Sequence, residues 1–151
     1  MKSYLAAAIQ MTSVPDLQRN LAQAEELIDL AVRRGAELIG LPENFSFLGE
    51  EVDKISQAPP MAQESELFLK PRAQRYQVTL LGGGFPMPVS ETQVYNTALL
   101  IDPSGTELAR YHKVHLFDVN LPDGNTYQES STVRAGSDMP PVYPSPDLGQ
   151  L

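Results

Sequence analysis

Apolar and polar positions follow two different periods along the first forty residues, which predicts a strand, a helix and a second strand. Residues 4–10 form a short apolar run typical of a buried strand. In residues 17–31 the apolar side chains recur at helical spacing, and Asp16 is a suitable N-cap because its carboxylate can accept from free amides. Residues 38–41 form a second apolar strand, ended by Pro42. This order predicts a βαβ unit with parallel strands and a right-handed crossover.

The next segments predict further strands. Residues 78–81 form an apolar strand that runs into three glycines at 82–84. Residues 94–101 and 107–113 suit an antiparallel pair, because Asp102-Pro103-Ser104-Gly105 between them carries the residue types of a tight turn. Strands that alternate with helices in this way indicate the α/β class.

Elsewhere the periodicity is weaker. Residues 46–60 are expected to form an irregular acidic loop, and residues 62–76 a helix that Pro71 kinks or starts anew. Residues 114–146 contain no periodic segment, and a loop of that length is functional or disordered. Residues 148–151 are expected to begin another strand.

The composition fits one globular domain and excludes two classes of partner. With 151 residues, 42% of them hydrophobic and 20% charged, the chain is long enough for one domain with its own core. It has 11 basic and 19 acidic residues and a net charge of −8, without the clustered Lys and Arg that phosphate contacts require. No run approaches the roughly 18 apolar residues of a membrane helix. We therefore expect no nucleic-acid partner and no membrane insertion.

Two further features concern the compartment. Residues 4–9 are apolar but shorter than the roughly 7–15 residues of a signal-peptide core, and no convincing cleavage site follows. The chain has no cysteine, which rules out disulfides and thiolate zinc sites within it. We expect a cytoplasmic protein.

The candidate catalytic residues are a glutamate and a lysine at predicted strand ends. Glu43 follows the strand at 38–41, where open α/β sheets bind ligands, and burial there would make it a proton acceptor near neutral pH. Lys113 ends the strand at 107–113, where its ammonium can stabilise a developing oxyanion. A capping carboxylate and a solvated edge lysine are the alternative interpretations.

Two histidines raise the alternative of a metal site. His112 and His115 are three residues apart on a predicted strand, so they point to opposite faces, and no H-E-x-x-H helix surrounds them. Asp118 and Glu129 could complete a ligand set, but nothing in the sequence fixes their distances. We expect no metal, and a metal hydrolase built on the two histidines is the weakest alternative.

The glycines at 82–84 match neither a dinucleotide-binding nor a phosphate-binding motif. Their missing side chains are expected to let another part of the chain approach closely. Asn44, Tyr95 and Asn96 are expected to make structural hydrogen bonds. Four aromatic residues suit a core and a pocket wall equally: Phe45, Phe47, Phe85 and Phe117.

Several of these segments together resemble the nitrilase superfamily, the carbon–nitrogen hydrolases. Residues 35–43, which end in Leu-Pro-Glu, are similar to its strand-plus-glutamate signature. Residues 95–98 and 105–117 resemble its hairpin and lysine motif, and residues 128–136 resemble the segment that carries a second active-site glutamate. The motif at 112–118, His-Lys-Val-His-Leu-Phe-Asp, is most similar to the Nit branch, whose members hydrolyse small carboxamides such as ω-amides of 2-oxo acids or deaminated glutathione.

The resemblance implies a portion of an α-β-β-α sandwich, with residues 1–151 as the amino-terminal part of a single carbon–nitrogen hydrolase domain that forms a homodimer in the intact protein. It also implies that a cysteine thiolate attacks the carbon of a small amide or nitrile. Glu43 then accepts the thiol proton, Lys113 stabilises the oxyanion, and Glu129 positions Lys113 and the substrate. No metal or organic cofactor is implied.

The chain departs from the family pattern at the nucleophile. In relatives the cysteine follows the counterparts of residues 148–151, and this chain contains none. We therefore expect an enzyme in the intact protein, with residues 1–151 inactive on their own. The alternative is a non-enzymatic subunit or binding module that pairs with a separate chain, because half a sandwich leaves strand edges open.

Overall fold

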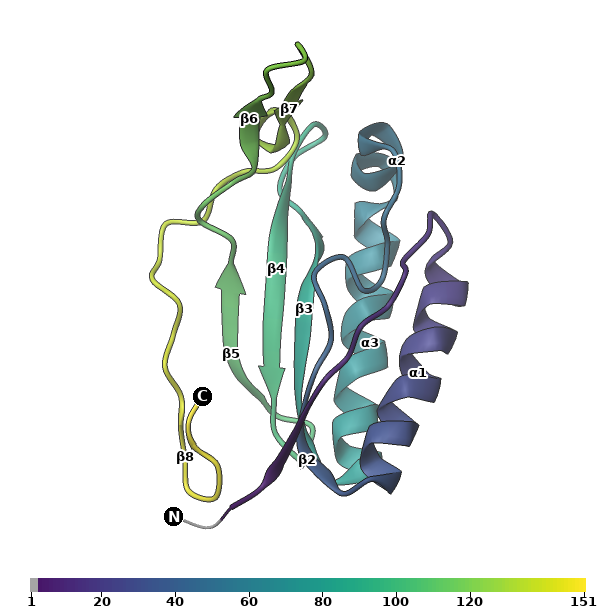
Figure 1. The fold of residues 1–151 in the computed structure, drawn as a ribbon, viewed down its shortest axis with the longest axis vertical. Coiled ribbons are helices and arrows are strands. Elements are labelled where there is room, and N and C mark those ends of the chain that lie inside the picture. Colours follow the sequence, from purple (N-terminus) through teal and green to yellow (C-terminus); the bar gives the residue numbers. More distant parts are fainter. Residues whose placement is uncertain (1–2) are drawn as a thin grey trace.

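A five-stranded sheet with two long helices on one face forms the body of the structure, a computed structural model that describes residues 3–151 (Figure 1). The main elements are, in chain order, β1 (Leu5–Ala8), α1 (Leu17–Arg33), β2 (Ala36–Gly40), α2 (Glu51–Ser56), α3 (Ala58–Tyr76), β3 (Thr79–Pro88), β4 (Val94–Ile101) and β5 (Glu107–His112). The short elements that follow are β6 (Asp118–Asn120), β7 (Thr126–Gln128), the 3-10 turn η1 (Glu129–Ser131), β8 (Pro144–Ser145) and β9 (Gly149–Gln150).

The strands lie in the order β1-β2-β3-β4-β5. The pairs β1–β2 and β2–β3 are parallel, whereas β3–β4 and β4–β5 are antiparallel. The predicted α/β class, the parallel βαβ unit and the antiparallel pair are therefore confirmed. Because β1, β2 and β3 run in one direction, their carboxyl ends meet at one edge of the sheet, the upper edge in Figure 1.

Local signals at both ends determine the extent of α1. Asp16 caps the helix by accepting a hydrogen bond from the Arg19 N–H at 3.0 Å. Gly35 follows the last turn with a φ of +86°, in the left-handed region that favours glycine. One face of the helix is buried against the sheet: Leu21, Ala24, Ile28 and Ala31.

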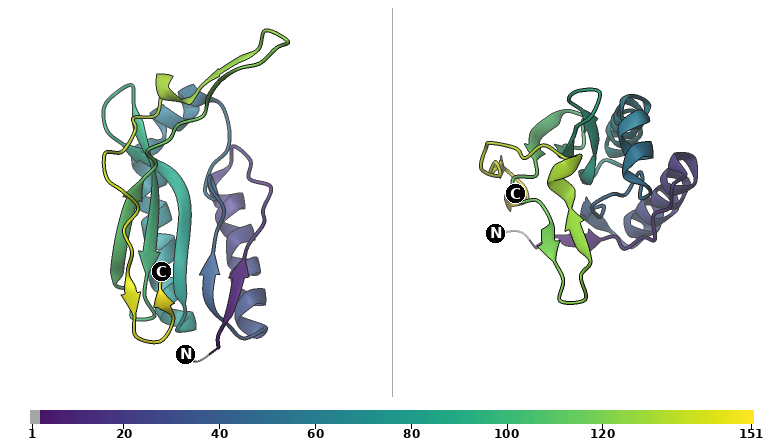
Figure 2. Two further views of the ribbon diagram at one scale, coloured as in Figure 1. Left: turned by 60° about the vertical axis from the view of Figure 1, so that its left-hand side comes forward. Right: turned by 90° about the horizontal axis from the view of Figure 1, so that it is seen from above.

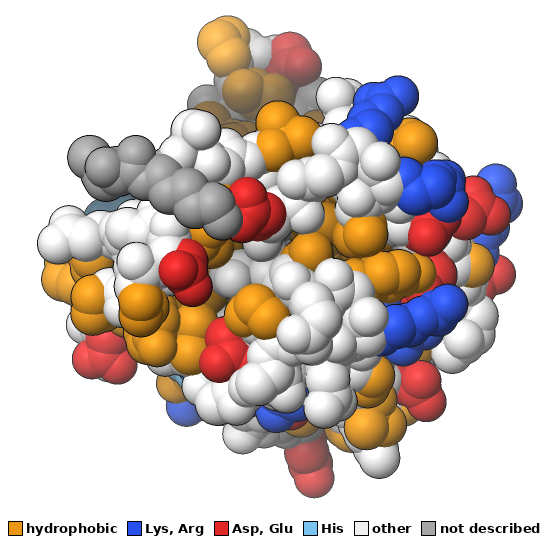
Figure 3. All heavy atoms as spheres, turned by 90° about the horizontal axis from the view of Figure 1, so that it is seen from below, with side chains coloured by type: hydrophobic (Ala, Val, Ile, Leu, Met, Phe, Trp, Pro, Cys, Tyr) orange, Lys and Arg blue, Asp and Glu red, His pale blue; other side chains and the backbone are white. Residues whose placement is uncertain are grey.

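Basic side chains gather at the end of the molecule opposite the carboxyl edge of the sheet. Seen from that end, most of the visible Lys and Arg side chains lie on the right, the side of the two long helices (Figure 3). The last turn of α1 contains Arg33 and the last turn of α3 contains Arg75. Cations in these positions compensate the negative end of the helix dipole.

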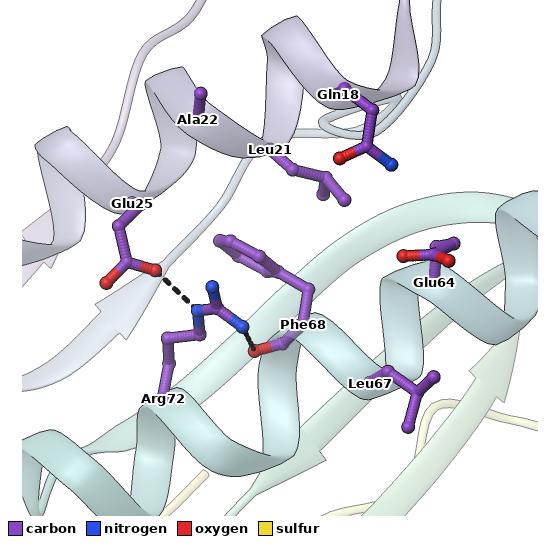
Figure 4. A pocket seen from close by; sticks show the side chains of 8 residues that line it. All are labelled: Gln18, Leu21, Ala22, Glu25, Glu64, Leu67, Phe68 and Arg72. Atoms are coloured by element: carbon purple, nitrogen blue, oxygen red, sulfur yellow. Dashed lines mark hydrogen bonds and ion pairs between the residues drawn. The ribbon is translucent and has the colours of Figure 1, made fainter.

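Helices α1 and α3 contact each other across a groove of about 300 Å³ (Figure 4). Arg72 of α3 forms an ion pair with Glu25 of α1 and lies 4.3 Å from the Phe68 ring centroid. Partial burial acts to raise the pKa of Glu25, but hydrogen bonds from Arg72 and Tyr76 outweigh it and keep that pKa below its ordinary value. Glu25 of α1 and Arg72 of α3 therefore pair across the groove, as in a helix-packing contact.

Of the four phenylalanines that suit either a core or a pocket wall, three lie in the core. Phe45 is fully buried between the sheet and α3, with ring centroids 6.1 Å from Phe85 and 6.4 Å from Phe68. Phe47 is buried as well, but Phe117 is 60% exposed. The core interpretation therefore holds for Phe45, Phe47 and Phe85, and the pocket-wall interpretation holds for Phe117.

The predicted irregular loop over residues 46–60 is wrong in its second half. Residues Glu51–Ser56 form α2, and α3 begins at Ala58. Pro59 and Pro60 stand in the first turn of α3. A backbone N–H there would have no intrahelical acceptor, so proline, which lacks this N–H, costs the helix no hydrogen bond. The helix continues past Pro71 to Tyr76.

Strand β3 is longer than predicted because it continues through the three glycines, with a register shift between Gly82 and Phe85. A Cβ atom on Gly82 would overlap the Leu69 side chain, and one on Gly83 would overlap the Pro42 carbonyl. The expected close approach to the glycines is therefore confirmed, and it extends the strand instead of ending it.

Residues 114–146 contain more structure than the sequence predicts. Strands β6 and β7 form a hairpin that projects beyond the sheet (Figure 2). The predicted strand at 148–151 is confirmed as β9, which pairs with β8. Both hairpins are too short for a periodic pattern to indicate them.

The face of the sheet that the helices leave free is apolar. It borders a cavity of about 420 Å³, which residues of the carboxyl-terminal segment also line. The lining side chains are Leu38, Leu81, Ala98, Leu100, Ala109, Tyr111, Pro140, Pro141 and Leu151. In residues 3–151 no helix combines the length and apolar character needed to span a membrane.

Candidate active site

Glu43 lies in the loop after β2, and this loop runs alongside β3. The Leu41 N–H donates to the Leu81 carbonyl at 2.9 Å, and the Asn44 N–H donates to the Gly84 carbonyl at 2.6 Å. Asn44 adopts a φ of +59°, a conformation that asparagine tolerates better than most residues. These contacts hold the Glu43 backbone at the carboxyl edge of the sheet.

Lys113 follows β5 and reaches the same edge. Its N–H donates to the Asn96 carbonyl at 2.9 Å, and its carbonyl accepts from the Gly136 N–H at 2.9 Å. Its ammonium Nζ lies 3.1 Å from Glu43 Oε1 and 2.9 Å from Glu129 Oε2. One cation therefore joins two carboxylates that come from distant parts of the chain.

The two carboxylates keep Lys113 charged. Partial burial acts to lower the pKa of Lys113. Hydrogen bonds to Glu129 and Glu43, together with the charges of both, outweigh that effect and raise the pKa above its ordinary value. The ammonium is consequently protonated throughout the neutral range.

Glu129 stands at the start of η1 and is the best covered of the three, with its side chain 16% exposed. Its Oε2 accepts from the Phe117 N–H at 2.6 Å as well as from Lys113. Its backbone carbonyl accepts from the Thr132 N–H at 3.1 Å and the Val133 N–H at 2.8 Å. Residues before the β6–β7 hairpin thus hold the Glu129 carboxylate, and residues after it hold the Glu129 backbone.

Glu43, Lys113 and Glu129 line one cavity of about 560 Å³. It lies at the end of the molecule from which the β6–β7 hairpin projects (Figure 2). The Phe117 and Tyr127 rings, with centroids 6.0 Å apart, form an aromatic part of its wall. The other lining residues are Asn44, Leu48, Glu51, Lys54, Thr126, Gln128 and Ser131.

The expectation that Glu43 is buried is wrong. Its side chain is 50% exposed, because the loop turns it toward the cavity at the rim of the sheet and not toward the core. Its neighbourhood combines a carboxylate that can accept a proton with an ammonium that can stabilise an oxyanion. A nucleophilic thiol is not among residues 1–151, because the chain contains no cysteine.

The two histidines do not meet in a ligand set. His112 Nδ1 lies 2.8 Å from Thr97 Oγ1, and its ring stacks on Tyr95 with centroids 4.2 Å apart. Burial and then the charge of Arg110 lower the pKa of His112, which favours the neutral ring. His115 is exposed. Across residues 3–151 no cluster of three His, Cys, Asp or Glu residues has metal-site geometry, so the metal alternative finds no ligand set there.

Asn96 belongs to the site, although the sequence predicted only structural hydrogen bonding for it. Its Nδ2 donates to Glu43 Oε1, while its carbonyl accepts from the Lys113 N–H. The available signal in the sequence was a polar residue within the apolar strand β4; the structure pairs it with Pro86, two residues beyond Gly84 of β3.

Comparisons with known proteins show the family of this chain. Residues 5–151 match the family model of the carbon–nitrogen hydrolases. The chain is 65% identical over 153 residues to a deaminated glutathione amidase of Synechocystis sp. (strain PCC 6803 / GT-S), a match that covers 100% of this chain and 56% of that protein. It is 33% identical over 142 residues to the omega-amidase NIT2 of Homo sapiens, covering 90% of this chain and 49% of that protein.

A solved structure gives the same result for the fold. The NitFhit protein of C. elegans superposes with a TM-score of 0.86 at 32% identity, over 97% of this chain and 36% of that chain. The chain spans about half the length of the curated relatives named above. The predicted nitrilase-type fold is thereby confirmed. The family model and the amidase relatives together establish that this chain belongs to the carbon–nitrogen hydrolase family, in its Nit-type branch.

Proposed function

We propose that the intact protein hydrolyses the carbon–nitrogen bond of small carboxamides, and that Glu43, Lys113 and Glu129 serve this reaction. The observation that carries the proposal is the Lys113 ammonium, held 3.1 Å from one carboxylate and 2.9 Å from another on the wall of a single cavity. Coupled charges of this kind beside a cavity are typical of functional sites.

The first half-reaction forms a thioester with a thiol from outside residues 1–151. Glu43 accepts the thiol proton while sulfur attacks the amide carbon, and the electron pair of the C=O π bond moves to oxygen. Lys113 stabilises that oxyanion. The proton on Glu43 then passes to the leaving nitrogen, the C–N bond breaks, and ammonia or an amine departs.

The second half-reaction restores the thiol. Glu43 takes a proton from water as the water oxygen attacks the thioester carbon, and Lys113 again faces the oxyanion. The C–S bond breaks and sulfur regains the proton from Glu43. The net change is amide plus water to carboxylic acid plus ammonia or amine. Glu129 holds Lys113 in place through the 2.9 Å contact between Oε2 and Nζ. The proposed reaction uses no cofactor.

Deaminated glutathione and ω-amides of 2-oxo acids are the proposed substrates. The names of the Synechocystis and human relatives support this class. A nitrile is the second substrate type that the same thiolate chemistry accommodates. The proposal also treats residues 1–151 as part of a single hydrolase domain and the intact protein as a homodimer, as the family resemblance implies. A cytoplasmic location stays a sequence-based prediction.

One observation favours a different role, a non-enzymatic subunit or binding module that pairs with a separate chain. The helix-free face of the sheet carries an apolar cavity of about 420 Å³, and Leu81 on its wall is 41% exposed. Exposed apolar surface occurs at protein–protein contacts as well as at ligand-binding grooves. Size-exclusion chromatography and amide hydrogen exchange together test this second role: a stable monomer of residues 1–151 with a well-protected sheet would contradict obligate pairing.

Amide hydrolysis is tested by measuring ammonia and amine release with residues 1–151 and with the product of the complete reading frame. We expect the pure 1–151 chain to be inactive and a thiol-containing product to be active on deaminated glutathione or an ω-amide. Glu43→Gln in that product should lower kcat by at least about 100-fold, because it removes the proton acceptor. Turnover by the pure 1–151 chain, or full activity of Glu43→Gln, would refute the proposal.

A further inference from the structure

Both donors that reach the Glu43 carboxylate use the same oxygen. Asn96 Nδ2 donates to Oε1, and Lys113 Nζ donates to Oε1 at 3.1 Å. Among residues 3–151 no hydrogen bond reaches the other oxygen, Oε2. A carboxylate oxygen has two in-plane lone pairs, so the two donors occupy those of Oε1 and leave those of Oε2 without a donor from residues 3–151.

Asn96 sets the position of the carboxylate and of the cation together. It is buried within β4, where its backbone pairs with β3 on one side and its carbonyl accepts from the Lys113 N–H at 2.9 Å on the other. Its side chain meanwhile reaches Glu43. One residue of the sheet therefore links the proton acceptor to the oxyanion-stabilising group.

The glycines of β3 provide the space for this link. A Cβ atom on Gly84 would overlap Oδ1 of Asn96, and one on Gly83 would overlap the backbone carbonyl of Pro42, directly before Glu43. Gly40 of β2 differs, because a Cβ atom there would meet no atom of residues 3–151 within 4 Å. Any side chain at position 84 must displace the Asn96 amide.

From this geometry we infer that Asn96 is a positioning residue that reserves Oε2 of Glu43 for proton transfer. The amide and the ammonium hold Oε1, and the free oxygen takes the proton first from the nucleophilic thiol and later from water. The inference rests on the proposed amide hydrolysis and names the oxygen atom that acts in it. Gly84 is part of the same unit, because its missing side chain lets the Asn96 amide reach the carboxylate.

The test uses the thiol-containing enzyme and two variants that disturb the link in different ways. Asn96→Leu removes the donor at nearly constant size, and Gly84→Ala displaces the amide without changing any charge. Both should lower kcat by about 10–100-fold with KM within about twofold, because a misplaced acceptor affects the transition state more than ground-state binding. Gly40→Ala is the matched control, a strand glycine of the same sheet at which a Cβ would meet no atom of residues 3–151, and it should keep parental kcat.

A second readout separates positioning from partial unfolding. The rate constant for alkylation of the thiol by iodoacetamide is a property of each folded molecule and depends on removal of the thiol proton. It should fall in Asn96→Leu and Gly84→Ala and stay at the parental value in Gly40→Ala. A merely structural role would reduce the number of reactive sites but leave this rate constant unchanged.

Two different outcomes would refute two different claims, the proposed function and the role of Asn96. If the parent enzyme does not hydrolyse amides, the proposed function fails, whatever the variants do. If the parent is active while both variants alkylate within twofold of the parental rate, the role of Asn96 is refuted and the proposed function survives. Parallel losses in both variants, with the Gly40→Ala control intact, support the inference.

Discussion

The two carboxylates beside Lys113 are supported in different ways. Glu43 belongs to a loop that hydrogen-bonds to β3 and receives a donor from the buried strand β4. Glu129 belongs to η1, next to the projecting β6–β7 hairpin. Its segment is anchored by a bridge between Val94 and Val133 and by a small apolar cluster that also includes Ala58.

This difference shows how the site is built. The sheet fixes the Glu43 side through packing in the main core, whereas the Glu129 side depends mainly on individual hydrogen bonds. Exposure shows the opposite order, since Glu129 is 16% exposed and Glu43 is 50% exposed. Coverage of a side chain and rigidity of its backbone are therefore separate properties here, and variants can separate them.

Two phenylalanines, one on the Glu43 side and one on the Glu129 side, should differ most in their effect on the free energy of unfolding. Phe85→Ala removes a fully buried ring of the main core and should lower the free energy of unfolding by about 3–5 kcal/mol. Phe117→Ala removes a ring that is 60% exposed and should change it by no more than about 0.5 kcal/mol. Denaturant unfolding followed by circular dichroism measures both. Equal losses would contradict the distinction between a packed side and a hydrogen-bonded side.

Removing the shared cation tests whether the two sides act as one site. Lys113→Met keeps the length of the side chain but removes the charge that contacts Glu43 and Glu129. In the thiol-containing enzyme we expect kcat to fall by about 100–1,000-fold, the range for loss of an oxyanion-stabilising donor. Steady-state amide hydrolysis measures the effect. Lys54→Met is the control on the same cavity wall and should have a smaller effect, since Lys54 contacts neither carboxylate of the pair.

The pH dependence of stability sharpens the same point. Because the carboxylates raise the pKa of Lys113 in the folded protein, this pairing contributes its full stability below the ordinary lysine value of about 10.4. The contribution is lost as the pH rises through the higher folded pKa. The free energy of unfolding of the wild type should therefore fall more steeply above about pH 10.4 than that of Lys113→Met. Identical pH profiles in denaturant unfolding would show that the pairing does not contribute.

The smallest expected effect concerns the Glu129 side of the site alone. Thr132 donates its hydroxyl to Glu51 and so connects the segment after η1 to α2. Thr132→Val should cost about 1 kcal/mol locally and raise amide hydrogen exchange around η1. Exchange in β2 and β3 should stay at the wild-type rate, as read by mass spectrometry of peptides from both regions. A uniform increase across the sheet would mean that the two sides do not open separately.

Local signals made part of the fold predictable. Asp16 and Gly35 mark the ends of α1, and the Asp102 turn joins β4 to β5, with Asp102 Oδ1 accepting from the Ser104 N–H at 2.8 Å and the Thr106 N–H at 2.9 Å. Each signal acts within a few residues, so it survives without knowledge of the fold. The prediction for residues 51–60 was wrong because the local signal was ambiguous. Prolines suit a loop and a first helical turn equally.

Some site residues could likewise be predicted from local signals, and others could not. Glu43 and Lys113 were predictable as residues at strand ends, because strand ends are visible in the local pattern. The link through Asn96 was not, since it depends on β4 lying beside the glycines of β3. The exposure of Glu43 also escaped prediction, because it depends on which way the loop turns at the rim of the sheet.

The sequence by itself determined the order of the two long helices and the five main strands, the β-α-β unit at the start and the residue types available for chemistry, including the absence of cysteine from residues 1–151. Only the tertiary structure decided that Lys113 meets a carboxylate 70 residues before it and another 16 residues after it. The physical reason is strand register. Hydrogen bonding between β2, β3, β4 and β5 determines which strand ends meet, and a slip of one residue would turn the side chains of a strand to the opposite face.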